Sequence, residues 1–148
     1  MDDAPSQRME AVIRAYIRAC NDADAQAIAE CLSLEAVHYF PSGYGPKWAG
    51  SSTIGRNIAK IAQEGQRCWT VDQVLIDVDR CAGVMEWTSF VRQHNSIIRG
   101  VDWFVFEPQS LRIQEVRSYT AAQIQPGKMR QELGDFDYAG RGYPTKFQ

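Results

Sequence analysis

Helical and strand-like patterns occupy separate parts of this sequence. Apolar residues recur every three to four positions between residues 6 and 20, which predicts an amphipathic helix with Ser6 as its N-cap. A short helix that ends near Leu32 follows, and a third begins at Ser51 or Ser52 and ends at Gly65. Strands are predicted over residues 36–40, 69–78, 83–91, 97–106 and 111–120. Because helices precede most strands, we expect an α+β fold in which one bent antiparallel sheet wraps against three helices.

The composition is that of one globular domain. The chain has 148 residues, of which 45% are hydrophobic and 23% charged. We expect the domain to span residues 1–148, with a core at about 8–122 and a C-terminal extension over 123–148. The extension is predicted either to close over the mouth of a cavity or to embrace a partner subunit.

Charge and hydropathy exclude several classes of protein. A net charge of −2 without a lysine or arginine run argues against nucleic-acid binding. No apolar run has the length of a membrane helix, and MDDAPSQRME lacks the apolar part of a secretion signal. A cytoplasmic location is therefore expected. The four cysteines form no CxxC pair and the two histidines lie far apart, so no metal site is predicted.

Three stretches resemble a known superfamily. They are AVIRAYIRACNDADAQAIAECLSLEAVHYF, the P-x-G loop running into WAGSSTIGRNIAKI, and GVMEWTSF followed by VDWFVFEPQSLRIQEVRSYT. Together they resemble the nuclear-transport-factor-two-like superfamily, with its SnoaL-like polyketide cyclases, ketosteroid isomerases, limonene epoxide hydrolases and scytalone-type dehydratases. The resemblance covers roughly residues 8–122. It implies a SnoaL-like cone with a deep apolar pocket, and a homodimer formed through the sheet.

The resemblance also assigns individual positions. Tyr16 in RAYIRA and Asp102 in VDWFVF match the tyrosine and aspartic acid that make the oxyanion hole of ketosteroid isomerases. Phe40 stands where those isomerases keep their base. The Asp-Arg-Asp trio of the epoxide hydrolases is absent, since the matching inward positions are Trp87, Ser89 and Ser118.

Three residues are candidates for catalysis by proton transfer. Asp102 lies in an apolar strand, so its pKa should be raised, unless it is solvated at a sheet edge. Tyr16 lies on the apolar stripe of the first helix and would stabilise negative charge on a substrate oxygen, or would be a core tyrosine. His38 shares the register of Phe40 and suits proton transfer near pH 7, or is a hydrogen-bonded core histidine.

The stretch HYFPSGYGPKW ends in a glycine-broken loop that we predict to form the rim of the pocket. Tyr44, Lys47 and Trp48 would bind substrate there, with Lys47 holding a carboxylate or phenolate, or else being a solvated lysine. His94, in the turn QHNS, is a weaker candidate. The full set of predicted substrate-binding residues is Phe40, Tyr44, Lys47, Trp48, Trp87, Ser89, Phe104 and Ser118; Phe90 and Phe106 are further candidates for the pocket wall.

These residues predict a cofactor-independent lyase, of the dehydratase or C–C-cleaving type, that uses acid–base catalysis. The substrate would be a hydrophobic ring compound bearing oxygens, such as a lignin-derived aromatic, steroid-like or polyketide molecule. The first alternative is an isomerase or cyclase of the ketosteroid-isomerase type, with His38 replacing the missing base. The second alternative is a non-catalytic ligand-binding module.

Overall fold

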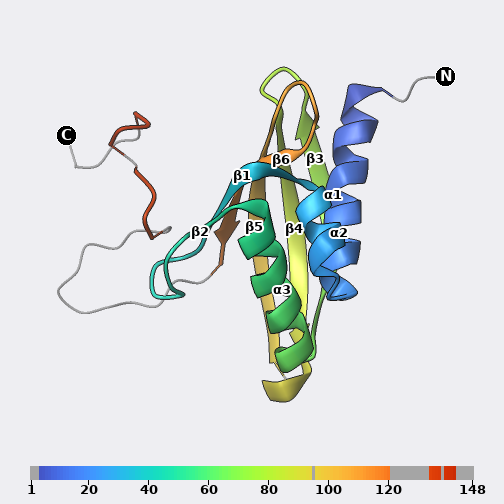
Figure 1. Cartoon of the computed structure of the whole chain (residues 1–148), viewed down its shortest axis with the longest axis vertical. Helices are drawn as coiled ribbons and strands as arrows, with labels where there is room; N and C mark the ends of the chain where they lie inside the picture. The colour runs from blue at the N-terminus through green and yellow to red at the C-terminus, as the bar shows by residue number, and fades with distance from the viewer. Residues whose placement is uncertain (1–3, 95, 121–133, 138, 143–148) are drawn as a thin grey trace.

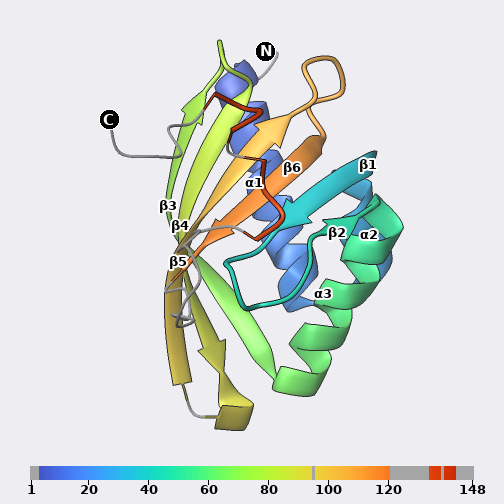
Figure 2. The same ribbon diagram turned by 90° about the vertical axis from the view of Figure 1, so that its left-hand side faces the viewer.

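The computed structural model describes residues 4–94, 96–120, 134–137 and 139–142. One curved six-stranded sheet forms a layer, and the helices cover one of its faces (Figures 1 and 2). The elements are α1 (Pro5–Asn21), α2 (Ala25–Glu30), β1 (Leu32–Tyr39), β2 (Trp48–Ala49), α3 (Ser51–Gly65), β3 (Arg67–Asp77), β4 (Ala82–Val91), a 3-10 turn (Arg92–His94), β5 (Ser96–Phe106) and β6 (Ile113–Tyr119).

The helix ends follow local chemistry. Pro5 is the first residue of α1, where its missing N–H costs nothing, so the N-cap is Ala4 rather than the predicted Ser6. Asp24 caps α2 by accepting a hydrogen bond from the N–H of Ala27 at 3.0 Å. The residue before α3 has a φ of 93°, which an L side chain rarely adopts. Glycine, here Gly50, suits that position because it has no side chain.

The order of strands in the sheet is β2-β1-β6-β5-β4-β3. The α+β fold with three helices on a curved sheet is confirmed. One detail of the predicted antiparallel sheet is corrected, because β1 and β6 run parallel. A parallel pair needs a long crossover connection, which α3 and strands β3 to β5 supply. The short strand β2, which pairs with β1, was not predicted.

The core lies between the helices and the inner face of the sheet. Successive residues of a strand point to opposite faces, so Asp102, Phe104 and Phe106 face inward while Trp103 faces outward. Gly55 lets α3 approach α2 closely, because an added Cβ would lie 2.4 Å from the carbonyl oxygen of Ala25. The largest fully buried side chains are Tyr16, Phe104, Phe106, Met9, Ile13, Ile28, Leu32, Ile54, Met85, Ile113 and Val116.

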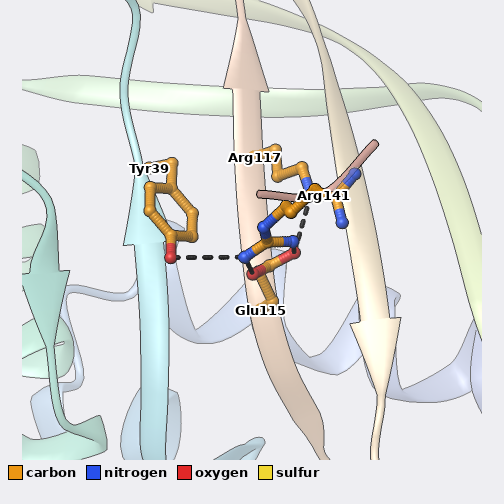
Figure 3. Close-up of polar contacts among 4 residues, drawn as sticks. All are labelled: Tyr39, Glu115, Arg117 and Arg141. Carbon is orange, nitrogen blue, oxygen red and sulfur yellow. Dashed lines mark hydrogen bonds and ion pairs between the residues drawn. The ribbon is translucent and has the colours of Figure 1, made fainter. Parts of the chain in front are cut away.

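The described part of the C-terminal extension packs on the outer face of β1 and β6. Phe136 is buried against Tyr39, with ring centres 5.3 Å apart. Arg141 donates to both carboxylate oxygens of Glu115, at 2.6 and 3.1 Å, and contacts the Tyr39 hydroxyl at 3.4 Å (Figure 3). Arg117 also pairs with Glu115, at 2.6 Å. The described tail residues therefore cover their own sheet.

The same tail segment holds the loop between β1 and β2. The N–H of Gly134 donates to the carbonyl of Phe40 at 2.9 Å. The N–H of Lys47 donates to the carboxylate of Asp135 at 3.2 Å. Both ends of the loop are thus fixed by the extension, while residues 121–133 and 143–148 of the predicted extension lie outside the described part of the chain.

Candidate functional site

A cavity of about 120 Å³ lies between the inner face of the sheet, α1, α3 and the β1–β2 loop. Eight of the predicted site residues line it: Tyr16, His38, Phe40, Tyr44, Trp48, Trp87, Asp102 and Ser118. Its other lining residues are Ile17, Cys20, Pro41, Ile58, Ile61, Arg67, Trp69, Met85, Ile98 and Thr120. The fold therefore brings together in one cavity side chains that lie far apart in the sequence.

A larger hollow of about 730 Å³ opens on the outer face of β1, β5 and β6. It is a surface groove with charged residues such as Glu35, Glu107, Arg112 and Arg141 along it. The buried polar groups with shifted pKa values, His38 and Asp102, lie in the smaller cavity instead. Buried titratable groups in a cavity are the stronger indication of a functional site.

A chain of hydrogen bonds links four strands inside the cavity. His38 Nε2 lies 2.7 Å from Ser118 Oγ. Ser118 is in turn hydrogen-bonded to the carboxyl group of Asp102. The indole N–H of Trp87 donates to Asp102 Oδ1 at 2.9 Å. The chain therefore runs from His38 on β1 through Ser118 on β6 to Asp102 on β5, and Trp87 on β4 anchors its end.

Burial shifts the pKa of both titratable groups in this chain toward the neutral form. Desolvation raises the pKa of Asp102 to about 6, and the hydrogen bonds from Ser118 and Trp87 counteract part of that rise. Desolvation lowers the pKa of His38 to about 3. At pH 7 His38 is therefore neutral and Asp102 is ionised.

These charge states determine which histidine nitrogen carries the hydrogen. An ionised Asp102 only accepts hydrogen bonds, so the Ser118 hydroxyl donates to it. The Ser118 oxygen then accepts from the Nε2–H of His38, a tautomer assigned from the network. His38 Nδ1 is left with a lone pair, and it is buried without a hydrogen-bond partner among the described residues. The residue that carries this unpartnered nitrogen lines the cavity.

Tyr16 is a core tyrosine that also lines the cavity. It is 2% exposed and packs edge-on against Phe104, with ring centres 6.0 Å apart. Its hydroxyl is hydrogen-bonded to Cys20, and burial raises its pKa well above the usual value. It lines the cavity as a protonated phenol, so it is at once a core tyrosine and a hydroxyl at the pocket wall.

Aromatic rings form the wall beside His38. Phe40 stacks on the imidazole with ring centres 4.2 Å apart and 18° between their planes. The ring centre of Trp48 lies 4.4 Å from that of Phe40 and 5.9 Å from that of His38. The Phe40 ring thus shields the imidazole from water, and this shielding is one source of the lowered pKa of His38.

Three predicted substrate-binding residues do not line the cavity. Lys47 is exposed and its ammonium group lies 5.9 Å from the ring centre of Tyr39, on the outer side of the sheet. Phe104 is fully buried in the core behind Tyr16. Ser89 is 1% exposed, and its Oγ has no partner among the described residues. A position on the inward face of a strand therefore places a residue inside the core, but not necessarily in the cavity.

Two further candidates for the wall also lie elsewhere. Phe106 is buried in the core, and Phe90 is 42% exposed. The side chain of His94 lies outside the part of the chain that the structure describes. The sequence prediction missed Arg67 and Trp69, which share the inward face of β3 and both line the cavity. Their two-residue spacing directly after Gly65 was the available signal.

The described residues include neither a candidate metal site nor a candidate membrane-spanning helix. Among the described residues, no three histidine, cysteine, aspartate or glutamate side chains are grouped so that they could hold a metal ion. None of the helices in the described ranges has the length and apolar character that crossing a membrane requires.

Comparison with solved structures finds a relative of high similarity. A protein of unknown function with a cystatin-like fold, from Methylobium petroleophilum PM1, is 38% identical to this chain, with a TM-score of 0.90. The match covers 96% of this chain and 94% of that one. No family model and no curated protein matches the chain.

Two more distant structures share the fold. The epoxide hydrolase/cyclase-like enzyme SalBIII, which has a role in pyran ring formation in polyether salinomycin, is 17% identical with a TM-score of 0.66. That match covers 78% of this chain and 92% of SalBIII. A nuclear-transport-factor-two-like protein of unknown function from Mesorhizobium loti is 18% identical with a TM-score of 0.67, over 82% of this chain and 98% of that one.

Proposed function

The chain has the cystatin-like fold of its 38%-identical relative and shares the fold of nuclear-transport-factor-two-like proteins, and from that premise we propose that it is a cofactor-independent lyase that acts by proton transfer on a small ring compound. The observation that carries this proposal is the hydrogen-bonded chain from His38 through Ser118 to Asp102, which ends in a buried histidine nitrogen without a partner among the described residues, on a residue that lines the cavity. A neutral histidine that is linked to a carboxylate can take a proton without becoming an imidazolium ion.

The reaction begins with His38 as the base. Nδ1 takes a proton from a substrate carbon, and the hydrogen on Nε2 passes to Ser118 Oγ. The Ser118 hydroxyl hydrogen passes to Asp102, which becomes a neutral acid. Its raised pKa, about 6, makes this transfer less costly than it would be for an ordinary aspartate. The imidazole remains neutral throughout, as its burial requires.

The same chain then works in reverse. His38 now carries its hydrogen on Nδ1 and donates it to the leaving oxygen of the substrate as a carbon–oxygen bond breaks. Asp102 returns its proton through Ser118, and the starting state is restored. The products are an alkene and water. Where a carbon–carbon bond breaks instead, Nδ1 takes a hydroxyl proton, the hydroxyl oxygen becomes the carbonyl of an aldehyde, and the departing carbon keeps the bonding electrons and receives the proton from Nδ1. A reaction in which one group, His38, acts first as the base and then as the acid suits elimination.

The size of the cavity bears on the substrate class. An apolar cavity of roughly 150 Å³ in another protein accommodates one benzene molecule. The cavity here, at about 120 Å³, has room for about one six-membered ring. We therefore favour a monocyclic substrate over the steroid-like and larger polyketide molecules that the sequence also allowed.

The isomerase alternative depends on where the proton is returned. His38 Nδ1 would deliver it to another carbon of the same molecule. The similarity of fold and the matching positions of Tyr16 and Asp102 support this alternative. However, Asp102 already accepts from Trp87 and Ser118, and Tyr16 is bonded to Cys20, so neither is arranged here primarily as an oxyanion hole.

The test uses monocyclic β-hydroxy ketones and aryl diols as substrates, with products identified by mass spectrometry and proton exchange followed by NMR in D₂O. Loss of water or of an aldehyde is the expected outcome. His38→Gln should lower turnover by roughly 10²–10⁴-fold, and Ser118→Ala and Asp102→Asn should each lower it as well. Isomerised products of unchanged mass would select the alternative. Turnover that is unchanged in His38→Gln would overturn the proposed role of His38.

A further inference from the structure

The cavity contains a cation without an acidic partner. Arg67, the first residue of β3, lines it. Its Nε is buried without a hydrogen-bond partner, and Arg67 forms no ion pair among the described residues. The guanidinium carbon lies 5.9 Å from the ring centre of Trp69, which also lines the cavity. A guanidinium group that is supported by an aromatic ring and by no carboxylate keeps its hydrogen-bond donors for a ligand.

Arg67 lies across the sheet from the reactive nitrogen. His38 is on β1 and Arg67 is on β3, which are separated in the sheet by β6, β5 and β4. Tyr44 of the β1–β2 loop and Arg67 of β3 line the same cavity. Burial lowers the pKa of Arg67, and Tyr44 opposes that shift. Arg67 is half-buried. Tyr44 is 50% exposed, while His38 is 6% exposed. Arg67 therefore lies near the open end of the cavity, and His38 lies at its buried end.

The interior between these two groups is apolar and aromatic. Ile58, Ile61 and Met85 line it together with Trp69 and Trp87. A ring in this space would keep a charged substituent near the opening, where it retains part of its hydration. Burial of the ring in the interior and pairing of the charge near the opening would then both stabilise binding of the same ligand.

We propose that Arg67 binds a carboxylate on the substrate, so that the protein acts on monocyclic compounds bearing a carboxylic acid. The inference deepens the proposed function and rests on it for the role of the cavity. The charge pairs with Arg67 at the open end, and the ring is held with its reactive carbon toward His38. The sequence had suggested Lys47 for this role, but Lys47 lies on the outer side of the sheet, and Arg67 takes its place in the cavity.

Calorimetric titration with matched acids and primary amides tests this inference without a known substrate. The probes are benzoate against benzamide and cinnamate against cinnamamide, pairs that share a shape and differ in charge. In the wild-type protein at least one acid should bind at least about tenfold more tightly than its amide, as expected for a charge-assisted pair. Arg67→Gln should abolish that preference by weakening the acid and leaving the amide unchanged.

Two further variants keep the outcome interpretable. Arg67→Lys retains the charge but not the planar pair of donors, so it should keep part of the preference. Arg92→Gln makes the same charge change at an exposed residue next to Gln66, to whose carbonyl its N–H donates, and should leave the preference intact. Melting temperatures of all three variants establish that they are folded.

The inference is overturned if acids and amides bind alike, if no probe binds, or if Arg67→Gln leaves the preference intact. A preference that depends on Arg67, without any turnover by the protein, would support the inference and count against the lyase. Turnover of neutral ring compounds that requires His38 but ignores Arg67 would support the lyase and overturn the inference.

Discussion

At the scale of single residues, the site depends on two groups whose pKa values burial shifts away from their ordinary range. Burial opposes the ionised form of Asp102 and the protonated form of His38. Ser118 lies between them and can both donate and accept, so it lets a proton move without leaving a charge on the imidazole. Replacing any member of this chain therefore changes both the chemistry and the stability of the fold.

Asp102→Asn should make the protein more stable at pH 8 and should have little effect at pH 4. The pKa of Asp102 is raised from 3.8 to about 6, so its contribution to stability is fully present below pH 3.8 and is lost as the pH rises through 6. The cost of the ionised form above that range is about 3 kcal/mol. Asparagine avoids it while keeping an oxygen for Trp87 and an N–H for Ser118.

Urea unfolding of both proteins across this pH range measures the difference in the free energy of unfolding. The wild-type protein is the reference for Asp102→Asn at each pH. A difference between variant and wild type that stays constant from pH 4 to pH 8 would contradict the raised pKa of Asp102.

At the scale of elements, the extension and the rim loop form one unit on the outside of the sheet. Phe136, which is 5% exposed, anchors the extension to Tyr39 on β1. Arg141 stacks over Phe136 with its guanidinium carbon 4.3 Å from the ring centre, and it pairs with Glu115. Because Gly134 and Asp135 hold the backbone of the β1–β2 loop, the anchor also limits how far the pocket rim can move.

Phe136→Ala should release this segment. Loss of a buried aromatic ring costs about 3 kcal/mol or more, which exceeds what a partly exposed ion pair contributes. Trypsin should then cleave after Arg141 faster than in the wild-type protein, with the fragments identified by mass spectrometry. Cleavage after Arg80, whose side chain is 79% exposed and pairs with Asp77, provides the internal control. Equal rates after Arg141 in both proteins would mean that Phe136 does not anchor the segment.

At the scale of the whole molecule, the two faces of the sheet have different roles. The inner face carries the cavity and the helices, while the outer face is partly covered by the extension and presents Trp103, 37% exposed, beside Val101 and Val105. The homodimer that the family resemblance implies remains a prediction, and this apolar strip is the surface on which it would form.

Sedimentation velocity tests that prediction directly. The wild-type protein should sediment as a dimer, and Trp103→Glu should shift it toward the monomer by placing a charge in the interface. Ala11→Glu, at an exposed residue of α1 on the opposite side of the sheet, serves as the matched control. A wild-type protein that sediments as a monomer throughout the micromolar range would contradict the predicted dimer.

The sequence by itself determined the class of fold and most of the element positions. Hydrophobic spacing located α1, α3 and the long strands to within a few residues, because amphipathic patterns record which face of an element is buried. It also placed Tyr16, His38 and Asp102 on inward faces, and these three do line one cavity. Which inward residues reach the cavity could not be predicted, since Ser89 and Phe104 share those faces and lie in the core.

Only the tertiary structure decided the hydrogen-bond partners and the charges of the site. Ser118 meets His38 across 80 positions of sequence, and this contact depends on the parallel pairing of β1 with β6. Arg67 belongs to the cavity because β3 and the β1–β2 loop converge there. Lys47 is excluded because the loop turns its side chain toward Tyr39. Local patterns report burial, whereas the choice of partner depends on strand order and loop path, which residues distant in the sequence determine jointly.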